Sequence, residues 1–534
     1  MNKSFIVFSV GKLLEVLAFV LLIPAAIAFF EITSRTFPEV LFDHKLLGFL
    51  IAIVASFVCG QVLKLLGNKE LTGTGIREGF AIVTFGWLVL TLFGAIPLFM
   101  FFMHQTGSFS VETAIRAFTD SYFEIMSGFT TTGASILTDI ESLPRGILFW
   151  RSMTHWLGGM GIVTLALAIL PVFGIASYQM FRGEVPGPTS ERLKPRLAET
   201  AKILWGVYAL LTILEVILLN FGGMPIFDGF CHAFGTMATG GFSTKNASIG
   251  AYKSAYIDWV VIVFMFFAGM NFIIHYQVLF ARKWSLVKSN REFHFYSMVL
   301  LIAILIAAAV LQIRGLAPKE QIARSYRNQP LTGQVLAEKM TEEKEKIRTP
   351  MDTFRCAAFQ VVSITTTTGY STADSDMWPN FIRFMLVVLM FFGGCAGSTG
   401  GGIKMTRIMV GIKASWREVK TLIQPRLIAH IKIAGKELKE KQVANIVGFI
   451  VLFLGCFVIF SAVMSFLIDD FTTAVTSVVA TMCNIGPGLS GIGTTQNYSW
   501  IPISGKWVLT LCMLLGRLEI YTVLIAFAPI SWKK

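Results

Sequence analysis

The chain has 534 residues, of which 54% are hydrophobic and only 14% are charged. An ordinary soluble protein has about a quarter charged residues, so this composition excludes a series of soluble domains, intrinsic disorder and fibrous structure. The formal net charge is +13, but the basic residues gather in short loops between apolar segments, which argues against a nucleic-acid partner. The composition predicts an all-α polytopic membrane protein.

Ten segments are apolar and long enough to cross a bilayer as helices, which takes about twenty residues each. They lie near 5–30, 46–67, 79–103, 147–172, 202–221, 257–280, 295–313, 381–402, 443–468 and 506–530. The first segment has the basic start of a signal peptide. Its length and its internal Lys12 and Glu15 favour a helix that is retained in the mature protein.

The charged loops predict the orientation of the chain. Basic residues dominate the loops 281–294 and 403–441, and the chain ends in Lys533 and Lys534. Because basic loops mark the cytoplasmic face, both termini are expected in the cytoplasm. The segment 314–350 carries charges of both signs and falls on the outer face.

Four segments between the predicted spans resemble one another and are too short and too polar to cross the membrane. In each, a glycine is followed two residues later by a serine, and the glycines are 108, 128 and 119 residues apart. The segments are SGFTTTGAS (127–135), GTMATGGFS (235–243), SITTTTGYS (363–371) and MCNIGPGLS (482–490). Internal repetition indicates one structural unit used several times, here a span, a re-entrant half-helix, an extended loop and a second span.

Such loops have a physical use at membrane depth, where non-helical backbone is tolerated only if it is buried in protein or lines water. Four of them around one axis would form a ring of backbone carbonyls that replaces the hydration shell of a cation. Glycine allows the backbone to turn its carbonyls inward, and the half-helices would point their negative C-terminal ends at the ion. A single stretch of this kind is equally well an ordinary turn, but four in register favour a pore.

These four loops and several other motifs resemble the Trk/Ktr/HKT potassium transporter superfamily. Within it, the sequence is most similar to the membrane subunits of bacterial Trk potassium uptake systems. The further motifs are HWLGGMG (155–161), AGMNF (268–272) with His275 and Tyr276, GGCAGSTGGGIK (393–404) and GRLE (516–519). The resemblance covers almost the whole chain, including the two extra N-terminal helices that are typical of the Trk branch.

The resemblance implies a pseudo-fourfold pore, built by one chain from four span–pore loop–span repeats. Two transmembrane helices are expected in 1–70, and the repeats in 71–180, 195–285, 292–425 and 440–534, with the outer insertion 314–350 in the third. The implied activity is uptake of K+ across the bacterial cytoplasmic (inner) membrane, with K+ as the transported ion and no organic cofactor on this chain. The implied partners are membrane lipid, a second copy of the chain in a homodimer, and a cytosolic nucleotide-binding regulatory subunit.

The resemblance also assigns the selectivity filter. Its glycines would be Gly133, Gly241, Gly369 and Gly488, and K+ would bind the backbone carbonyls of Thr132, Gly240, Thr368 and Pro487. The remaining filter candidates are Thr131, Thr239, Thr367 and Gly486. In the family a serine at the first position accompanies sodium transport, so Gly133 favours potassium. The fourth loop departs from the threonine-rich pattern, because Gly486 and Pro487 precede its glycine.

A glycine-rich segment lies within the predicted span near 381–402. Six of the ten residues from Gly393 to Gly402 are glycine, and each costs about 1 kcal/mol relative to alanine inside a helix. The segment is therefore expected to be a loop. The resemblance makes it an intramembrane gate beneath the filter, formed by Gly397, Ser398, Thr399, Gly400, Gly401 and Gly402; the alternative is a packing interface of small residues between helices. Lys404 and Arg407, which follow it, are expected on the basic inner face.

Arg517 lies near the middle of the last predicted span, with Glu519 two residues later. A charge inside the membrane is costly and usually faces a partner or an aqueous cavity. In the family, a basic side chain at this place faces the pore near the gate loop, which makes Arg517 an additional gate candidate. The alternative is a structural salt bridge with an acidic residue of another helix.

Two other classes of protein share single features with this sequence. Gly488–Gly491 matches the Gly-x-Ser-Gly string of intramembrane serine proteases, but these need a later histidine, and the last one here is His430; the chain also has no zinc-protease motif and no paired cysteine spacing. An enzyme is therefore not expected. Inverted-repeat transporters are disfavoured because the repeats run in one direction. A sodium- or proton-coupled potassium symporter and a poorly selective monovalent cation transporter remain alternatives.

Overall fold

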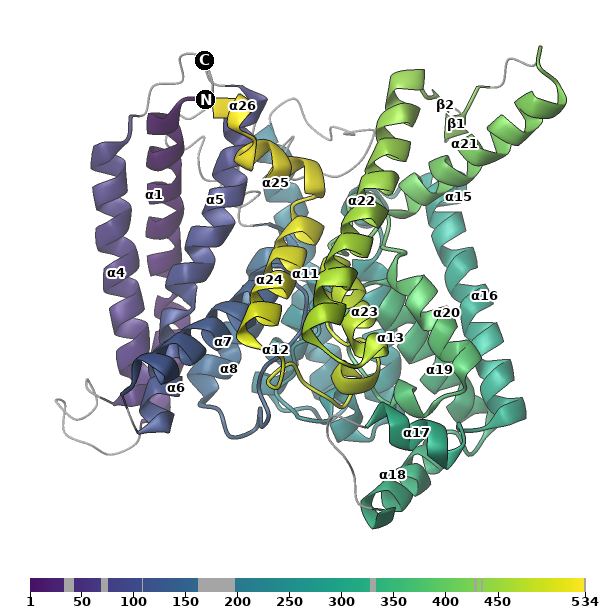
Figure 1. Ribbon diagram of the computed structural model, residues 1–534, viewed down its shortest axis with the longest axis horizontal. Helices are drawn as coiled ribbons and strands as arrows, with labels where there is room; N and C mark the ends of the chain where they lie inside the picture. The colour runs from purple at the N-terminus through teal and green to yellow at the C-terminus, as the bar shows by residue number, and fades with distance from the viewer. Residues whose placement is uncertain are drawn as a thin grey trace.

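The computed structural model describes residues 1–32, 43–68, 75–107, 109–161, 197–326, 333–426, 430–433 and 436–532. Helices dominate the molecule (Figure 1), and β1 (Lys432–Ile433) pairs with β2 (Lys436–Glu437) in a short antiparallel hairpin. Both termini lie at one end, called here the termini face. The opposite end, called here the distal face, carries α17 (Lys319–Ser325) and α18 (Gly333–Lys346).

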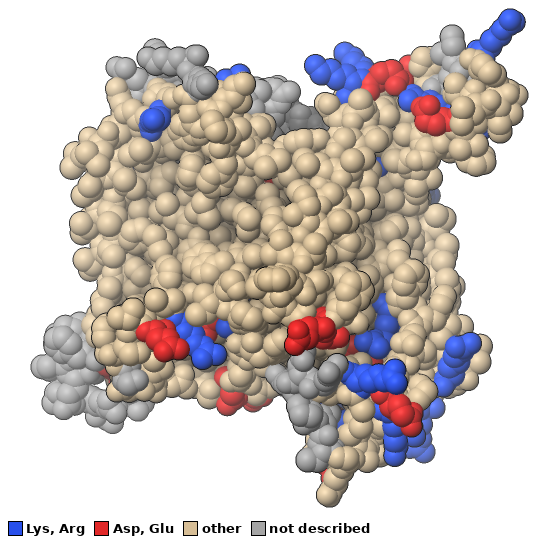
Figure 2. Space-filling view, viewed as in Figure 1, with Lys and Arg blue, Asp and Glu red and all other residues tan. Residues whose placement is uncertain are grey.

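The helices have the length and composition of membrane spans. Among the described residues, six continuous helical segments qualify by themselves: Lys3–Glu31, His44–Leu66, Arg77–Thr106, Ala201–Phe221, Arg291–Arg314 and Glu440–Leu467. Two further spans are bent helix pairs. On the face shown in Figure 2, charged side chains gather at the two ends and leave a broad middle band nearly without charge. The prediction of an all-α polytopic membrane protein is confirmed.

Several of the ten predicted spans differ from continuous helices. The segment near 257–280 is α13 (Ala255–Ala268) followed by α14 (Phe272–Leu279) at 104°, and that near 506–530 is α24 (Ile503–Arg517) followed by α25 (Ile520–Phe527) at 112°. The segment near 381–402 is helical only in α20 (Asn380–Met390). The segment near 147–172 begins as α8 (Arg145–Gly159), and its residues from 162 lie outside the described part.

The first two spans pack closely at a pair of glycines. They are formed by α1 (Lys3–Val20) with α2 (Leu22–Glu31) and by α4 (His44–Leu66). A Cβ atom on Gly11 would lie 2.7 Å from the carbonyl oxygen of Gly60, so a side chain here would force the helices apart. Beside this crossing, Glu15 accepts hydrogen bonds from Lys12 (2.8 Å) and Gln61 (2.6 Å). Glu15 thus has partners both within the first span and on the neighbouring helix α4.

Four units follow, each with a spanning segment, a short pore helix, a loop and a second spanning segment, as predicted. The first unit has α5 (Ile76–Gly94) with α6 (Ile96–Thr106), the pore helix α7 (Val111–Phe129) and α8; the second has α11 (Leu197–Phe221), the pore helix α12 (Ile226–Met237), α13 and α14. The third has α16 (Arg291–Arg314), the pore helix α19 (Pro350–Thr365), α20 and α21 (Met405–Ile423); the fourth has α22 (Glu440–Leu467), the pore helix α23 (Phe471–Met482), α24 and α25.

The remaining described elements are short helices: η2 (Ser248–Tyr252), α15 (Ser285–Ser289), η3 (Ser375–Met377), η4 (Ser490–Ile492) and α26 (Pro529–Trp532).

Local sequence fixes where three of the pore helices begin. The side chains of Ser110, Thr349 and Asp470 precede α7, α19 and α23, and each accepts a hydrogen bond from a backbone N–H of the first turn. Such N-caps stabilise a helix by about 1 kcal/mol. Pro350, at the first position of α19, also suits a helix start because its missing N–H would have no helical partner there.

Candidate functional site

All four pore helices end in the same backbone turn. The first residue of the turn has a left-handed φ of 52°, 55°, 62° and 55° at Thr131, Thr239, Thr367 and Asn484. Two residues later φ is again positive, at 78°, 80°, 82° and 96°, and each of these residues is a glycine: Gly133, Gly241, Gly369 and Gly486. The left-handed region favours glycine and strains other residues. The recurrence of this pair of angles shows that the four loops share one conformation.

The fourth loop has a register that differs by two residues from the expected one. Gly486 occupies the place of Gly133, Gly241 and Gly369, whereas Gly488 was expected there. Gly488 lies farther along the chain, where its N–H donates to the carbonyl of Ile492 (2.8 Å). The carbonyl equivalent to those of Thr132, Gly240 and Thr368 is consequently that of Ile485 and not that of Pro487.

The loops form a closed ring through their glycines. A Cβ atom on Gly133 would overlap the carbonyl oxygen of Gly240 in the next loop. In the same way, Gly241 lies against the oxygen of Thr368, and Gly369 against that of Ile485. Gly486 closes the circle, since its Cβ would lie 2.6 Å from the oxygen of Thr132. Every loop therefore touches the next, and a side chain at any of these glycines would push on the neighbouring carbonyl.

Polar side chains behind the ring hold the first two loops. Glu124, in α7, accepts hydrogen bonds from the Ser135 hydroxyl and the Ile136 N–H, both at 2.9 Å, and forms a buried ion pair with Arg151 at 2.6 Å. His232 stands at the same place in α12, nine residues before the loop glycine, and its Nε2 lies 2.9 Å from the Ser243 hydroxyl. Each brace ties a pore helix to the loop that follows it.

Other contacts join one loop to the next. The hydroxyl of Tyr370, in the third loop, donates to the carbonyls of His232 (3.0 Å) and Phe242 (3.1 Å) of the second unit. His155 lies between the first two units: its Nε2 accepts from the Phe242 N–H at 3.2 Å, and its Nδ1 lies 2.7 Å from the Gly128 carbonyl. Since Nε2 accepts, the proton of the neutral ring is on Nδ1 and is donated to Gly128.

The glycine-rich segment is a loop on the termini side of the ring, as its composition indicated. Thr399 donates from its hydroxyl to the carbonyl of Met237 at the end of α12 (2.9 Å). The N–H of Gly401 donates to the hydroxyl of Thr367 (2.7 Å), and a Cβ on Gly401 would overlap the carbonyl of Cys483. The loop therefore lies directly against the ends of three pore helices.

Arg517 connects this loop to the first unit. Its guanidinium donates to the carbonyl of Thr399 (2.7 Å), to that of Gly159 (2.9 Å) and to that of Gly158. The neighbouring Glu519 forms a salt bridge with Arg407 of α21, in which the carboxylate lies 2.7 Å from the guanidinium. Arg517 thus lies beside the glycine-rich loop, and its role as part of a gate stays a prediction.

Lys404 and Arg407 are not on the inner surface, where they were expected. Lys404 is 5% exposed, and its ammonium group donates to the carbonyl of Gly400 within the glycine-rich loop. Arg407 is also buried, with its guanidinium 4.0 Å from the centre of the Phe449 ring. Inside the protein, Lys404 binds a carbonyl oxygen and Arg407 binds the Glu519 carboxylate. A count of basic residues in loops could not show these partners.

The family model described as "TrkH: Cation transport protein" matches residues 46–534. The chain belongs to the TrkH cation transport family. Similar relatives are the Trk system potassium uptake protein TrkH of Salmonella typhimurium (36% identical, covering 91% of this chain and 92% of the relative), TrkH of Vibrio parahaemolyticus (34%, 98% of each) and TrkG of Escherichia coli (30%, 92% and 93%).

A solved TrkH structure has the same fold. The crystal structure of the potassium transporter TrkH from Vibrio parahaemolyticus matches with a TM-score of 0.80 at 32% sequence identity, and the match covers 100% of both chains. The resemblance inferred from the four loops and the glycine motifs is confirmed, and so is the fold class that it implied.

Within this TrkH-family fold, sequence reasoning missed one carboxylate at the glycine-rich loop. Glu292, at the start of α16, accepts hydrogen bonds from the N–H groups of Ala396 (2.8 Å) and Thr406 (3.1 Å) through a single oxygen. One side chain therefore holds both ends of the glycine-rich loop. The available signal was the presence of one acidic residue in an otherwise basic loop, 281–294.

Proposed function

We propose that this chain is the membrane subunit of a potassium uptake system and that the ring of four loops is its selectivity filter. The observation that carries the proposal is the closure of the ring, in which each loop glycine lies against a carbonyl of the next loop. The filter would consist of Thr131–Gly133, Thr239–Gly241, Thr367–Gly369 and Asn484–Gly486. Several relatives are named as potassium uptake proteins, which supports K+ as the transported ion.

Carbonyl coordination supplies the physical basis of selectivity. The oxygens of Thr132, Gly240, Thr368 and Ile485 would replace water around K+ as it enters the ring. The four pore helices end immediately before the loops, so their C-terminal dipoles add negative potential at the same place. In this proposal backbone carbonyls bind the ion without a side-chain carboxylate. K+ is the transported ion, and the proposal includes no organic cofactor.

The glycine-rich loop, with Arg517, would be the gate on the termini side of the filter. Its residues Gly397–Gly402 contact the pore helices, and Arg517 holds Thr399 through a hydrogen bond. A guanidinium close to the ion path opposes a cation by Coulomb repulsion, and this effect is strong where water is scarce. To open the gate, these hydrogen bonds would have to break and the Arg517 side chain would have to move.

The proposal includes the setting of the protein. The termini face would be cytoplasmic, since the helix α21, whose sequence includes Lys413, Arg417 and Lys420, lies towards it (Figure 1). The distal face would then be outside the bacterial inner membrane. A homodimer and a cytosolic nucleotide-binding regulatory subunit, which could dock on the basic region 403–441, complete the proposed system. The proposal keeps 71–180, 195–285, 292–425 and 440–534 as the residue limits of the four repeats.

Ion flux tests the filter directly. The protein is produced in cells that lack their own potassium uptake, with and without a Trk regulatory subunit, and rubidium and sodium influx are measured. Gly369→Ser is expected to lose selectivity, because a side chain there overlaps Ile485. Gly315→Ser is the matched control, since Gly315 also has a positive φ (63°) but no neighbour within 4 Å. Sodium influx equal to or above rubidium influx in the unmodified protein would refute the proposal.

A further inference from the structure

The fourth loop is held differently from the first two. The residue nine positions before Gly486 is Ser477, and its hydroxyl donates to Ala474 within its own helix (2.8 Å). It therefore does not brace the loop as Glu124 and His232 do in their units. Beyond Gly486, Ser490 has a left-handed φ of 61°, which is strained for a residue with a side chain. Such a conformation persists only where surrounding groups hold the backbone, so groups other than Ser477 must do so here.

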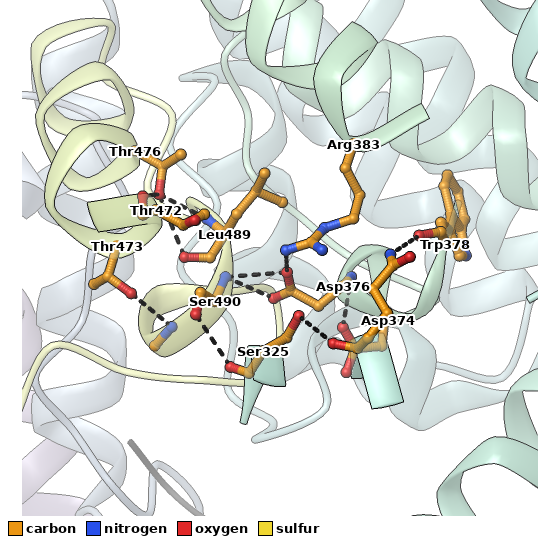
Figure 3. Close-up of polar contacts among 12 residues, drawn as sticks. Ser325, Asp374, Asp376, Trp378, Arg383, Thr472, Thr473, Thr476, Leu489 and Ser490 are labelled. Carbon is orange, nitrogen blue, oxygen red and sulfur yellow. Dashed lines mark hydrogen bonds and ion pairs between the residues drawn. The ribbon is translucent and has the colours of Figure 1, made fainter. Parts of the chain in front are cut away.

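Three successive N–H groups of this segment each have an acceptor (Figure 3). The N–H groups of Leu489 and Gly491 donate to the hydroxyls of Thr476 (3.1 Å) and Thr473 (3.0 Å), both in the pore helix α23. The middle N–H, that of Ser490, donates instead to the carboxylate of Asp376, at 3.0 and 3.1 Å to its two oxygens. Asp376 belongs to η3 in the third unit, so the backbone N–H of the strained residue is held from outside its own unit.

The insertion on the distal face supports this carboxylate. Tyr326, which follows α17, donates its hydroxyl to Asp374, and Asp374 also accepts from the Asp376 N–H at 3.0 Å. The Ser325 carbonyl accepts from the Ser490 hydroxyl (3.3 Å). Ile322, Met340 and Met377 are buried together in a small apolar cluster beneath these contacts. The insertion is thus fastened to η3 and touches the fourth loop.

We propose that Asp376 is a positioning residue that fixes the outer part of the fourth filter loop, and that its ionised form is required for full selectivity. The inference rests on the proposed function, because it assumes that the ring selects the ion. The ionised carboxylate holds the Ser490 N–H through a charge-assisted hydrogen bond, which is roughly twice as strong as a neutral one. A protonated carboxyl would hold Ser490 less firmly and would weaken its ion pair with Arg383 (2.9 Å).

The charges around Asp376 set the pH at which its carboxylate takes up a proton. Burial raises the pKa of the Asp376 carboxyl to about 7; the neighbouring Asp374 adds to the rise, and Arg383 opposes it. Other charged or titratable groups of the surrounding elements include Lys319, Glu320 and Arg324 of α17, Tyr326 after it, Lys339, Glu343 and Lys346 of α18, and Asp470 at the start of α23. Because the folded pKa is raised, the carboxylate is ionised above about pH 7 and takes up a proton below it.

The test measures the ratio of rubidium to sodium influx as external pH is lowered from about 8.5 to about 5.5. The ratio is used because the membrane potential drives both monovalent cations equally. In the unmodified protein it is expected to fall by roughly twofold to tenfold across neutral pH, which corresponds to the loss of about one hydrogen bond. Asp376→Asn should keep the low ratio at every pH. Glu338→Gln, which removes an exposed carboxylate of α18, should follow the unmodified profile.

A second variant keeps the test decisive if Asp376→Asn does not reach the membrane. Arg383→Gln removes the group that opposes the pKa rise, so the midpoint of the profile should move to higher pH. A pH-independent ratio in the unmodified protein, or an unchanged midpoint in Arg383→Gln, would overturn the inference. Failure of the proposed function is distinguishable, because the unmodified protein would then show no preference for rubidium at any pH.

Discussion

The hydroxyl of Tyr498 donates a hydrogen bond to the carbonyl of Gly486, at 2.6 Å, while the Tyr498 N–H donates to the carbonyl of Ser135, at 2.8 Å. Tyr498, which follows the fourth loop in the chain, is thereby joined to the glycine of that loop and to the segment just after Gly133 of the first loop. The second bond connects the last unit of the chain to the first, where no covalent connection exists, and the first bond joins this connection to the fourth loop.

Tyr498→Phe should loosen this closure. The Gly486 carbonyl would lose a partner in a buried place, which costs about 1–3 kcal/mol. Rubidium-to-sodium selectivity is expected to fall severalfold, and the thermal midpoint of the purified protein should fall as well. Tyr256→Phe, at a tyrosine that is 45% exposed, is the matched control and should change neither. Unchanged selectivity in Tyr498→Phe would show that the fourth loop keeps its place without this bond.

The register of the fourth loop can be tested with two alanine variants. Gly486→Ala puts a methyl group 2.6 Å from the Thr132 carbonyl at a φ of 96°, which only glycine adopts easily. Gly488→Ala meets the flexible end of the Ile492 side chain instead. Potassium selectivity, measured by ion influx, should be lost in the first variant and largely kept in the second. The reverse order would favour the register expected from the sequence.

Glu124 and Arg151 should contribute strongly to stability as a pair. Their side chains are 0% and 1% exposed, so removal of one partner leaves a buried charge alone. Such a loss typically costs about 3–5 kcal/mol, and Glu124→Gln should lower the thermal midpoint measured by tryptophan fluorescence in detergent. Glu141→Gln breaks the exposed pair with Lys245 and should cost at most about 1 kcal/mol.

The double variant Glu124→Gln with Arg151→Met separates charge from packing. If the cost of Glu124→Gln comes from the unpaired guanidinium, the double variant should be more stable than the single one. Additive losses would instead indicate that the hydrogen bonds of Glu124 to Ser135 and Ile136 account for the effect.

Glu292→Ala should release both ends of the glycine-rich loop. If this loop closes the pore, basal rubidium uptake without a regulatory subunit should rise by roughly twofold to tenfold, in keeping with the loss of one or two hydrogen bonds. Glu292→Gln should have a smaller effect, because its amide oxygen can still accept. Selectivity should stay unchanged, since Glu292 accepts its hydrogen bonds from Ala396 and Thr406, which flank the glycine-rich loop and are not part of the ring. Glu440→Gln, at an exposed pair with Arg417, is the control.

The parts of the site that could be predicted are those with a local signature. Thr131 to Gly133 and Thr367 to Gly369 lie in nearly identical strings, and the glycines recur at a spacing that fits one helix–loop–helix unit. The glycine-rich loop was predictable because six glycines within ten residues oppose a helix. Such features depend on a few adjacent residues, and therefore the sequence shows them directly.

The parts that could not be predicted depend on residues far apart in the chain. The serine at 490 suggested Gly488 as the equivalent glycine, but Ser490 is held by Asp376, which is 114 residues away. Glu292 reaches Ala396 across 104 residues, and Arg407 reaches Glu519 across 112. Lys404 looked like a surface residue because its partner, the Gly400 carbonyl, becomes available only once the loop folds back.

The ring of four loops is made by a single covalent chain, and its quarters are therefore chemically different. In an assembly of four identical subunits, one substitution alters all four quarters at once. A substitution that changes the binding free energy in one quarter then changes it in each of the four. Here a change at Gly133, Gly241, Gly369 or Gly486 alters one quarter and leaves three intact. If the ring selects the ion, as we propose, cation preference can be adjusted in steps, with each quarter free to acquire its own supporting side chains, as Glu124, His232 and Asp376 illustrate.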